Sequence, residues 1–275
     1  MRITMNDGVG LEVEVAGDGP GLLLLHGLGG AKEDFADHVP TLARDHTVVT
    51  FDHRGHGASD NPTDPAAYSL ERLVVDALAV ADATGLDHFR LLGHSMGGMV
   101  ARKIAIQESS RVDALVMMDT SAGPIPGFDP ELMDVGVDVA LTQGKQALKD
   151  LLDMVSATET PAYRRVLAER PGFVEFEARK WDGMSEIMWG TLAHELAHQS
   201  DDLPAMVASM RAPLLLLVGA QDKPFVIASE LMADAIAGAQ LEVVPDAGHS
   251  PQFENPSAWI AAMMSFLSAL PATAR

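Results

Sequence analysis

The sequence has 275 residues, of which 47% are hydrophobic and 21% are charged, as expected for a mid-sized globular domain with a substantial core rather than a disordered chain. Its formal net charge of −20 disfavours nucleic acids and anionic membranes as partners, because their phosphate groups would be repelled. Cysteine is absent, which excludes disulfides, thiolate nucleophiles and cysteine-ligated metals.

The start of the chain, MRITMNDGVG, contains no apolar signal core. The longest aliphatic runs, at 22–25 and 214–218, are far shorter than the roughly 20 residues that a membrane-spanning helix needs. We therefore expect a soluble protein of the cytoplasm.

Short apolar runs with strand character alternate along the chain with longer helical patterns. The predicted strands are 11–15, 21–26, 47–52, 89–94, 114–119, 213–219 and 241–246. The predicted helices are 31–43, 69–84, 96–107, 226–237 and 256–269. Apart from the first, the strands are almost continuously apolar, as in a parallel sheet that is buried on both faces. The alternation predicts an α/β fold with a mostly parallel, doubly wound sheet.

This alternation stops between residues 124 and 205. Pro- and Gly-containing segments at 123–130 and 199–204 border the interval, whose pattern is helical. We predict an inserted helical cap at 124–205, with 1–123 and 206–275 forming the core. Such an insertion would lie over the strand ends, where open α/β sheets bind ligands.

The predicted cap is rich in methionine and holds two of the three tryptophans, Trp181 and Trp189. We expect most of these side chains to pack the insertion's own core. Candidate substrate contacts are Trp181, Met188 and Trp189 in the cap, together with His26 and Gly27 at the end of the second predicted strand. The methionine and tryptophan content predicts a substrate with an apolar portion.

The stretch FRLLGHSMGGMV, at 89–100, joins a predicted strand to a predicted helix and contains G-x-S-x-G. The motif alone is weak, but strand, sharp turn and helix are the setting of a nucleophile elbow. A Cβ at position 93 or 97 would collide with the neighbouring strand or helix. The helix N-terminus would also direct N–H groups toward developing negative charge. Ser95 is therefore the candidate nucleophile.

A serine hydroxyl needs a base, and the base needs a carboxylate that fixes its tautomer. His249, in VVPDAGHSPQFENP, follows a predicted strand and precedes the last helix. Asp222, in LLLLVGAQDKP, follows another buried strand. Asp119, at the end of LVMMD, is the alternative acid, and we favour Asp222. The carboxyl ends of three parallel strands would bring Ser95, Asp222 and His249 together.

The remaining histidines are interpreted as structural. Those that flank the site loops are predicted to be hydrogen-bonded: His26, His53, His56 and His94. Three more are interpreted as surface or turn residues: His38, His46 and His88. Asp52 is expected to cap a turn or to bind Arg54.

HELAH, at 194–198, matches the H-E-x-x-H zinc-protease signature. No third ligand is evident downstream, because Asp201 and Asp202 lie in a predicted loop. We favour an amphipathic cap helix with Met188, Leu192 and Leu196 as its apolar stripe, and we predict no metal.

Nucleotide binding is not indicated either. GLGGAK, at 27–32, carries Lys32 where G-x-G-x-x-G requires its last glycine, and the chain has no P-loop. We therefore predict no cofactor.

With these pieces in place, the chain resembles the α/β-hydrolase family over almost its whole length, apart from the cap. The segments that carry the resemblance are 22–30, 51–60, 91–98, 217–224 and 245–256. The resemblance implies that backbone N–H groups of Leu28 and Met96 form an oxyanion hole. It also implies that DHRGHGAS shapes one wall of the pocket.

The resemblance and the three candidate residues predict a serine hydrolase that cleaves a small-molecule ester or lactone through an acyl-enzyme on Ser95. Two alternatives remain: a carbon–carbon bond hydrolase that acts on a diketone with the same residues, and a slow or non-catalytic small-ligand receptor. Serine at position 95 argues against dehalogenases and epoxide hydrolases, whose nucleophile is a carboxylate. The sequence does not predict the oligomeric state.

Overall fold

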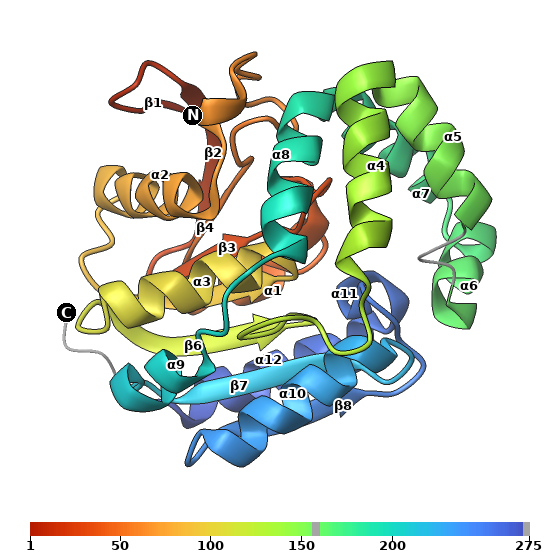
Figure 1. Ribbon diagram of the computed structural model, residues 1–275. Coiled ribbons are helices and arrows are strands. Elements are labelled where there is room, and N and C mark those ends of the chain that lie inside the picture. The colour runs from red at the N-terminus through yellow and green to blue at the C-terminus, as the bar shows by residue number, and fades with distance from the viewer. Residues whose placement is uncertain (156–159, 272–275) are drawn as a thin grey trace.

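Eight strands form a single sheet in the computed structural model, which describes residues 1–155 and 160–271 (Figure 1). The strands are β1 (Arg2–Thr4), β2 (Gly10–Ala16), β3 (Gly21–Leu25), β4 (Thr47–Phe51), β5 (Phe89–His94), β6 (Val112–Met118), β7 (Leu214–Gly219) and β8 (Gln240–Val244). Their order across the sheet is β1-β2-β4-β3-β5-β6-β7-β8. Strands β1, β2 and β4 pair antiparallel, and the pairs from β4 to β8 are parallel. The predicted α/β class and the mostly parallel sheet are confirmed.

All seven predicted strands are present, and β1 is an eighth that sequence analysis missed. This strand has three residues and lies at the edge of the sheet, where only Ile3 is partly buried. Such a short strand shows no periodic apolar pattern, so the sequence gives no signal for it.

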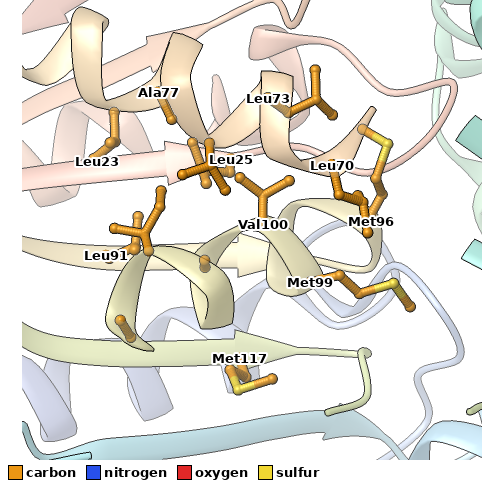
Figure 2. Packing of buried hydrophobic residues seen from close by; sticks show 14 of the residues in the cluster. Leu23, Leu25, Leu70, Leu73, Ala77, Leu91, Met96, Met99, Val100 and Met117 are labelled. Atoms are coloured by element: carbon orange, nitrogen blue, oxygen red, sulfur yellow. The ribbon is translucent and has the colours of Figure 1, made fainter. Parts of the chain in front are cut away.

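The central strands are buried on both faces because their side chains alternate between two hydrophobic clusters. In β3, Leu23 and Leu25 belong to one cluster, and Leu22 and Leu24 belong to the other. Figure 2 shows the first cluster, where Val100 lies near Leu25. The continuous apolar runs in the sequence therefore reflect a sheet that is covered on both sides.

The helices of the core cover the two faces of this sheet. They are η1 (Lys32–Phe35), α1 (Val39–Leu42), η2 (Pro65–Ala67), α2 (Leu70–Ala83), α3 (Met96–Gln107), α9 (Leu203–Ser209), α10 (Lys223–Ala235), α11 (Pro251–Glu254) and α12 (Pro256–Ala269). The predicted helix at 31–43 is wrong in form, because a 3₁₀ turn and a short α-helix replace it. Pro40 explains the break, since it has no N–H to continue a preceding helix and restricts the residue before it.

Helices α4–α8 follow β6 and precede β7 in the chain, within the interval predicted as a cap, and lie over one edge of the sheet (Figure 1); we call them the cap helices. They are α4 (Pro130–Gln143), α5 (Lys145–Val155), α6 (Pro161–Glu169), α7 (Phe173–Gly183) and α8 (Glu186–Ala197). The described part of 124–205 contains helices and no strand. Helix α9 runs through the predicted boundary at 205 and packs against α3 and α10 of the core. Among the described residues, no helix combines the length and apolarity required to span a bilayer.

Leu217→Ala tests whether burial in the central sheet stabilises the fold. Leu217 lies in β7 and is fully buried, whereas Leu231 on α10 is 54% exposed. We expect Leu217→Ala to lower the free energy of unfolding by about 2–5 kcal/mol, through lost burial and the cavity that remains. Leu231→Ala is the matched control and should change it by less than about 0.5 kcal/mol. Urea denaturation measures both, and equal effects would contradict the assigned burial.

Candidate functional site

Ser95 lies in a strained turn between β5 and α3. Its φ of 52° and ψ of −118° are unusual for a residue with a side chain and cost about 1–3 kcal/mol. The turn closes tightly: a Cβ on Gly93 would overlap the carbonyl group of Gly97, and a Cβ on Gly97 would overlap the carbonyl oxygen of Leu25 in β3. The collisions that the sequence predicts at positions 93 and 97 are thus present in the structure.

The three candidate residues from distant strand ends meet at one edge of the sheet. His249 Nε2 lies 3.0 Å from Ser95 Oγ, and His249 Nδ1 lies 2.6 Å from Asp222 Oδ2. Asp222 follows β7 and His249 follows β8, so parallel neighbours bring the two side chains together. The acid that forms a hydrogen bond with His249 is Asp222, which the sequence favoured over Asp119.

Carboxylates set the protonation of His249. Burial alone would lower its pKa. The Asp222 carboxylate faces the ring and accepts its hydrogen bond, and Glu254 lies nearby. Together these two groups raise the pKa of His249 above the ordinary value. Glu254 is itself buried and accepts a hydrogen bond from the backbone N–H of Gly248. Sequence analysis did not single out Glu254, although it lies in the quoted segment PQFENP.

Asp119 lies beside this pair as a second, buried carboxyl group. Its Oδ1 accepts a hydrogen bond of 3.0 Å from the Gly219 N–H, and side-chain ligand atoms of Asp119, Asp222 and His249 lie within 4.8 Å of one another. Burial first, and then the charge of Asp222, raise the pKa of Asp119 well above its usual range. Burial thus favours the protonated form of Asp119, and the carboxylate that faces and contacts the imidazole is that of Asp222.

Histidines support the loop that follows β3. The backbone N–H of His53 donates to His26 Nε2 at 3.0 Å, so His26 carries its proton on Nδ1, which donates to the Gly27 carbonyl at 2.8 Å. The Gly29 N–H donates to His56 Nε2 at 3.1 Å. Burial lowers the pKa of His26 and holds that of His56 well below its usual range, so both rings are neutral. These contacts fix the loop from residue 26 to residue 29.

This loop reaches Ser95 through its backbone. A Cβ on Gly27 would stand 3.2 Å from the Cβ of Ser95, so the segment that leads into Leu28 is in contact with the serine. Met96 is the first residue of α3 and follows Ser95 directly. Leu28 thus follows a residue that lies close to Ser95, and Met96 follows Ser95 directly, so the two come from different elements.

His94 holds the backbone of His249 through a hydrogen bond to its carbonyl oxygen. His94 Nε2 lies 2.7 Å from the His249 carbonyl oxygen, and because a carbonyl only accepts, this nitrogen carries the proton. Burial first, and then the neighbouring His249, lower the pKa of His94 to about 3. The prediction of hydrogen-bonded structural histidines is thus confirmed for His26, His56 and His94. It is wrong for His53, whose ring nitrogens are buried without a partner and whose edge packs on Phe51.

The interpretation of His38 and His46 as surface or turn residues holds for the turn: His38 lies in a turn, and His46 lies in the bend that follows one. Both are nevertheless buried, because His38 packs on Trp259 and His46 bonds to the Leu42 carbonyl. His88 is exposed, as expected. Asp52 caps a turn by accepting from the Ala58 N–H, but Arg54 pairs with Asp76 and Asp7 instead.

A cavity of about 180 Å³ opens beside Ser95 and His249. Polar and apolar surface contribute about equally to its wall, and its polar and charged side chains include Asp34, Tyr163, Glu177, Lys180, Ser250 and Glu254. The Nζ atom of Lys180, on cap helix α7, lies 3.1 Å from Asp34 Oδ1 and 2.7 Å from Glu177 Oε1. Sequence analysis missed this ion cluster, because nothing in the local pattern links Lys180 to a carboxylate far away in the chain.

Of the five predicted substrate contacts, only Gly27 is among the described residues that line this cavity. Met188 and Trp189 are buried in the hydrophobic cluster between cap and core, and Trp181 packs against it. His26 is buried, and its two ring nitrogens bond to the backbone groups of Gly27 and His53. The four other side chains thus pack the fold, and the structure does not support substrate contact by them. Nor do the described residues of DHRGHGAS line this cavity, so the wall that the resemblance implied is instead a support for the loop.

Comparison with known proteins agrees with this architecture. The family model described as alpha/beta hydrolase fold matches residues 20–256. A protein of Pseudomonas savastanoi pv. phaseolicola, provisionally named a carbamate hydrolase, RutD, is 28% identical over 92% of this chain and 95% of its own length. The enol-lactonase from Burkholderia xenovorans LB400 superposes with a TM-score of 0.83 at 25% identity, covering 98% of this chain and all of the other. A thermophilic esterase from Thermogutta terrifontis superposes with a TM-score of 0.82 at 25% identity, and the match covers 98% of both chains.

Histidine titration followed by NMR tests the electrostatics of the site. We expect His249 to titrate above the ordinary imidazole value of about 6.5, so that it is protonated at pH 6. His94 should stay neutral between pH 4.5 and 9. Asp222→Asn removes the facing carboxylate and should move the His249 midpoint down by about one pH unit or more. An unchanged midpoint in this variant, with His88 as the exposed reference, would contradict the assigned contact.

Proposed function

This chain belongs to the α/β-hydrolase family, and we propose that it hydrolyses a carboxylic ester or lactone through an acyl-enzyme on Ser95. The observation that carries the proposal is the hydrogen-bonded chain from Ser95 Oγ through His249 to Asp222, with distances of 3.0 Å and 2.6 Å. Nucleophile, base and orienting acid in this arrangement are what acyl transfer requires. The similar enol-lactonase and esterase structures support the choice of substrate class.

In the proposed reaction, His249 Nε2 accepts the proton of Ser95 as Oγ attacks the carbonyl carbon. Asp222 holds the proton on Nδ1, which leaves Nε2 free to act as the base, and stabilises the imidazolium that forms. His249 then gives its proton to the leaving alkoxide, and the acyl group remains on Ser95. A water molecule that loses its proton to His249 next attacks the acyl carbon, which releases the carboxylic acid and restores the serine.

The tetrahedral intermediates carry negative charge on the former carbonyl oxygen. We assign its stabilisation to the backbone N–H groups of Leu28 and Met96, since both segments border Ser95. One donor of this kind contributes about 3–4 kcal/mol in the transition state. The buried histidines described above hold the Leu28 loop in place before substrate arrives, so the donors need not reorganise during the reaction.

The cavity favours a small, polar substrate over the apolar portion that the sequence suggested. Its volume of about 180 Å³ is below the ~300–1,000 Å³ typical of drug-sized ligands. Its wall carries the carboxyl groups of Asp34, Glu177 and Glu254 but one ammonium group, that of Lys180. Carboxylates accept hydrogen bonds, so the wall suits substrates with hydroxyl or other hydrogen-bond-donating groups. The cap's methionines and tryptophans do not reach this wall, so their apolarity has no bearing on the substrate.

Replacement of the nucleophile gives the first test of the proposal. Ser95→Ala should reduce kcat for ester hydrolysis by roughly 10⁴–10⁶-fold without loss of folding, because the attacking oxygen is gone. Ser250→Ala is the matched control: this serine also lines the cavity but does not contact His249 Nε2. A serine-directed phosphonate should label residue 95 alone, as read by peptide mass spectrometry.

The same experiment separates the alternatives. Retention of most activity in Ser95→Ala would refute the acyl-enzyme. Turnover of a vinylogous diketone in the absence of ester turnover would indicate carbon–carbon cleavage instead. No adduct and no turnover with either substrate class would favour a receptor.

Acyl chain length tests the proposed substrate size. With p-nitrophenyl esters, kcat/KM should be highest for acetate and butyrate and fall by roughly 10-fold or more for decanoate, because the cavity cannot enclose a long chain. Circular dichroism of the protein with each ester checks that detergent-like substrates do not unfold it. A rise in kcat/KM with chain length would contradict the small polar site.

A further inference from the structure

Two cap helices carry a group of metal-ligating side chains away from the cavity that holds Ser95. His194 Nδ1 on α8 lies 2.9 Å from Asp134 Oδ1 on α4. His198 Nε2, one helical turn after His194, lies 3.0 Å from Asp134 Oδ2. We propose that Asp134, His194 and His198 bind a Zn²⁺ ion that bridges α4 and α8.

The geometry of these donors suits the ion. One ligand atom from each residue lies within 4.8 Å of the other two. Zinc binds histidine nitrogen and carboxylate oxygen at about 2.0–2.2 Å, which places neighbouring ligand atoms about 3.3 Å apart in a tetrahedral site. The present contacts of 2.9 Å and 3.0 Å need to open by only a few tenths of an ångström. Water would complete the coordination.

Exposure allows this adjustment. The side chains of His194, His198 and Asp134 are 58%, 41% and 40% exposed, so each can change its rotamer without disturbing the core. Two imidazoles and one carboxylate, with water in the remaining position, are a donor set that zinc uses in proteins. The acidic surface, with a net charge of −20, further favours a cation.

Asp134 supplies the third ligand that the sequence did not reveal. Asp134 lies 60 residues before His194, on the other side of HELAH from the residues that follow the motif. Contact between α4 and α8 brings the two segments together, and this contact exists only in the folded cap. The two helices lie side by side in Figure 1.

The remaining residue of the motif separates this site from a zinc protease. Glu195 would be the general base of such an enzyme, but its Oε2 accepts a hydrogen bond of 2.8 Å from the Leu70 N–H at the start of α2. Neither histidine is among the described residues that line the cavity beside Ser95. The ion would therefore stabilise the cap rather than take part in the hydrolysis.

Calorimetric titration of the metal-free, untagged full chain with Zn²⁺ tests the proposal. We expect about one ion per chain and a rise in Tm that a chelator reverses. His198→Ala and the nearly isosteric Asp134→Asn should each weaken binding by about tenfold or more, because one of three protein ligands is lost. His88→Ala is the matched control. It removes a 64% exposed histidine whose Nδ1 lies 3.6 Å from Asp113 Oδ1, and it should leave binding unchanged.

Three results would overturn the proposal. The first is the absence of saturable zinc binding by the wild-type chain. The second is equal affinity in the wild type and in both ligand variants. The third is binding at the only other such group among the described residues, Asp119, Asp222 and His249, which would be lost in His249→Ala and would inhibit turnover. Because binding is measured without substrate, failure of the proposed hydrolysis would not affect this test.

Discussion

The candidate site depends on how closely β5, α3 and β3 approach one another around Ser95. Gly93 and Gly97 leave no space for a Cβ at either position, and Gly98 packs in the same way against Thr120. The backbone of Ser95 is held on both sides, by a bond from its N–H to the Met118 carbonyl and by one from Thr120 Oγ1 to its own carbonyl. The strained φ persists because the burial of α3 on the sheet stabilises it. If the turn relaxed, Ser95 Oγ would lose its contact with His249.

Behind this turn, burial and charge act together to give His249 one ionised partner. Two carboxyl groups in contact cannot both ionise at low cost, and burial raises the pKa of Asp119, which favours its protonated form. Asp222 is left as the charge that faces the imidazole. The Gly219 N–H satisfies one oxygen of Asp119, which keeps the neutral acid in place beside the ion pair. The same low polarity that neutralises Asp119 strengthens the attraction between Asp222 and His249.

The features that the sequence predicted are those set by local pattern together with the topology of parallel sheets. Continuous apolar runs identify strands buried on both faces, and residues that follow such strands must gather at one edge, as Ser95 and His249 do. Contacts between cap and core have no comparable signal. Met188 has the same apolarity whether it faces a ligand or packs over Gly55, where it lies. His38 is buried because Trp259 lies beside it, and neither segment indicates that neighbour on its own.

The border between cap and core beside the cavity is held by charged groups, and these groups account for the charged side chains in the cavity wall. Lys180 of α7 reaches the buried Asp34 next to the loop that borders Ser95, and Arg165 of α6 donates to the carbonyl of Glu254. Buried ion pairs add little net stability, because desolvation of the charges offsets their attraction. They do fix orientation, since loss of one partner leaves an unpaired buried charge. In this chain, therefore, side chains that hold the cap against the core also line the cavity beside Ser95. A change in the position of the cap would alter the shape of this cavity, and hence the proposed substrate specificity, before it moved Ser95, His249 or Asp222.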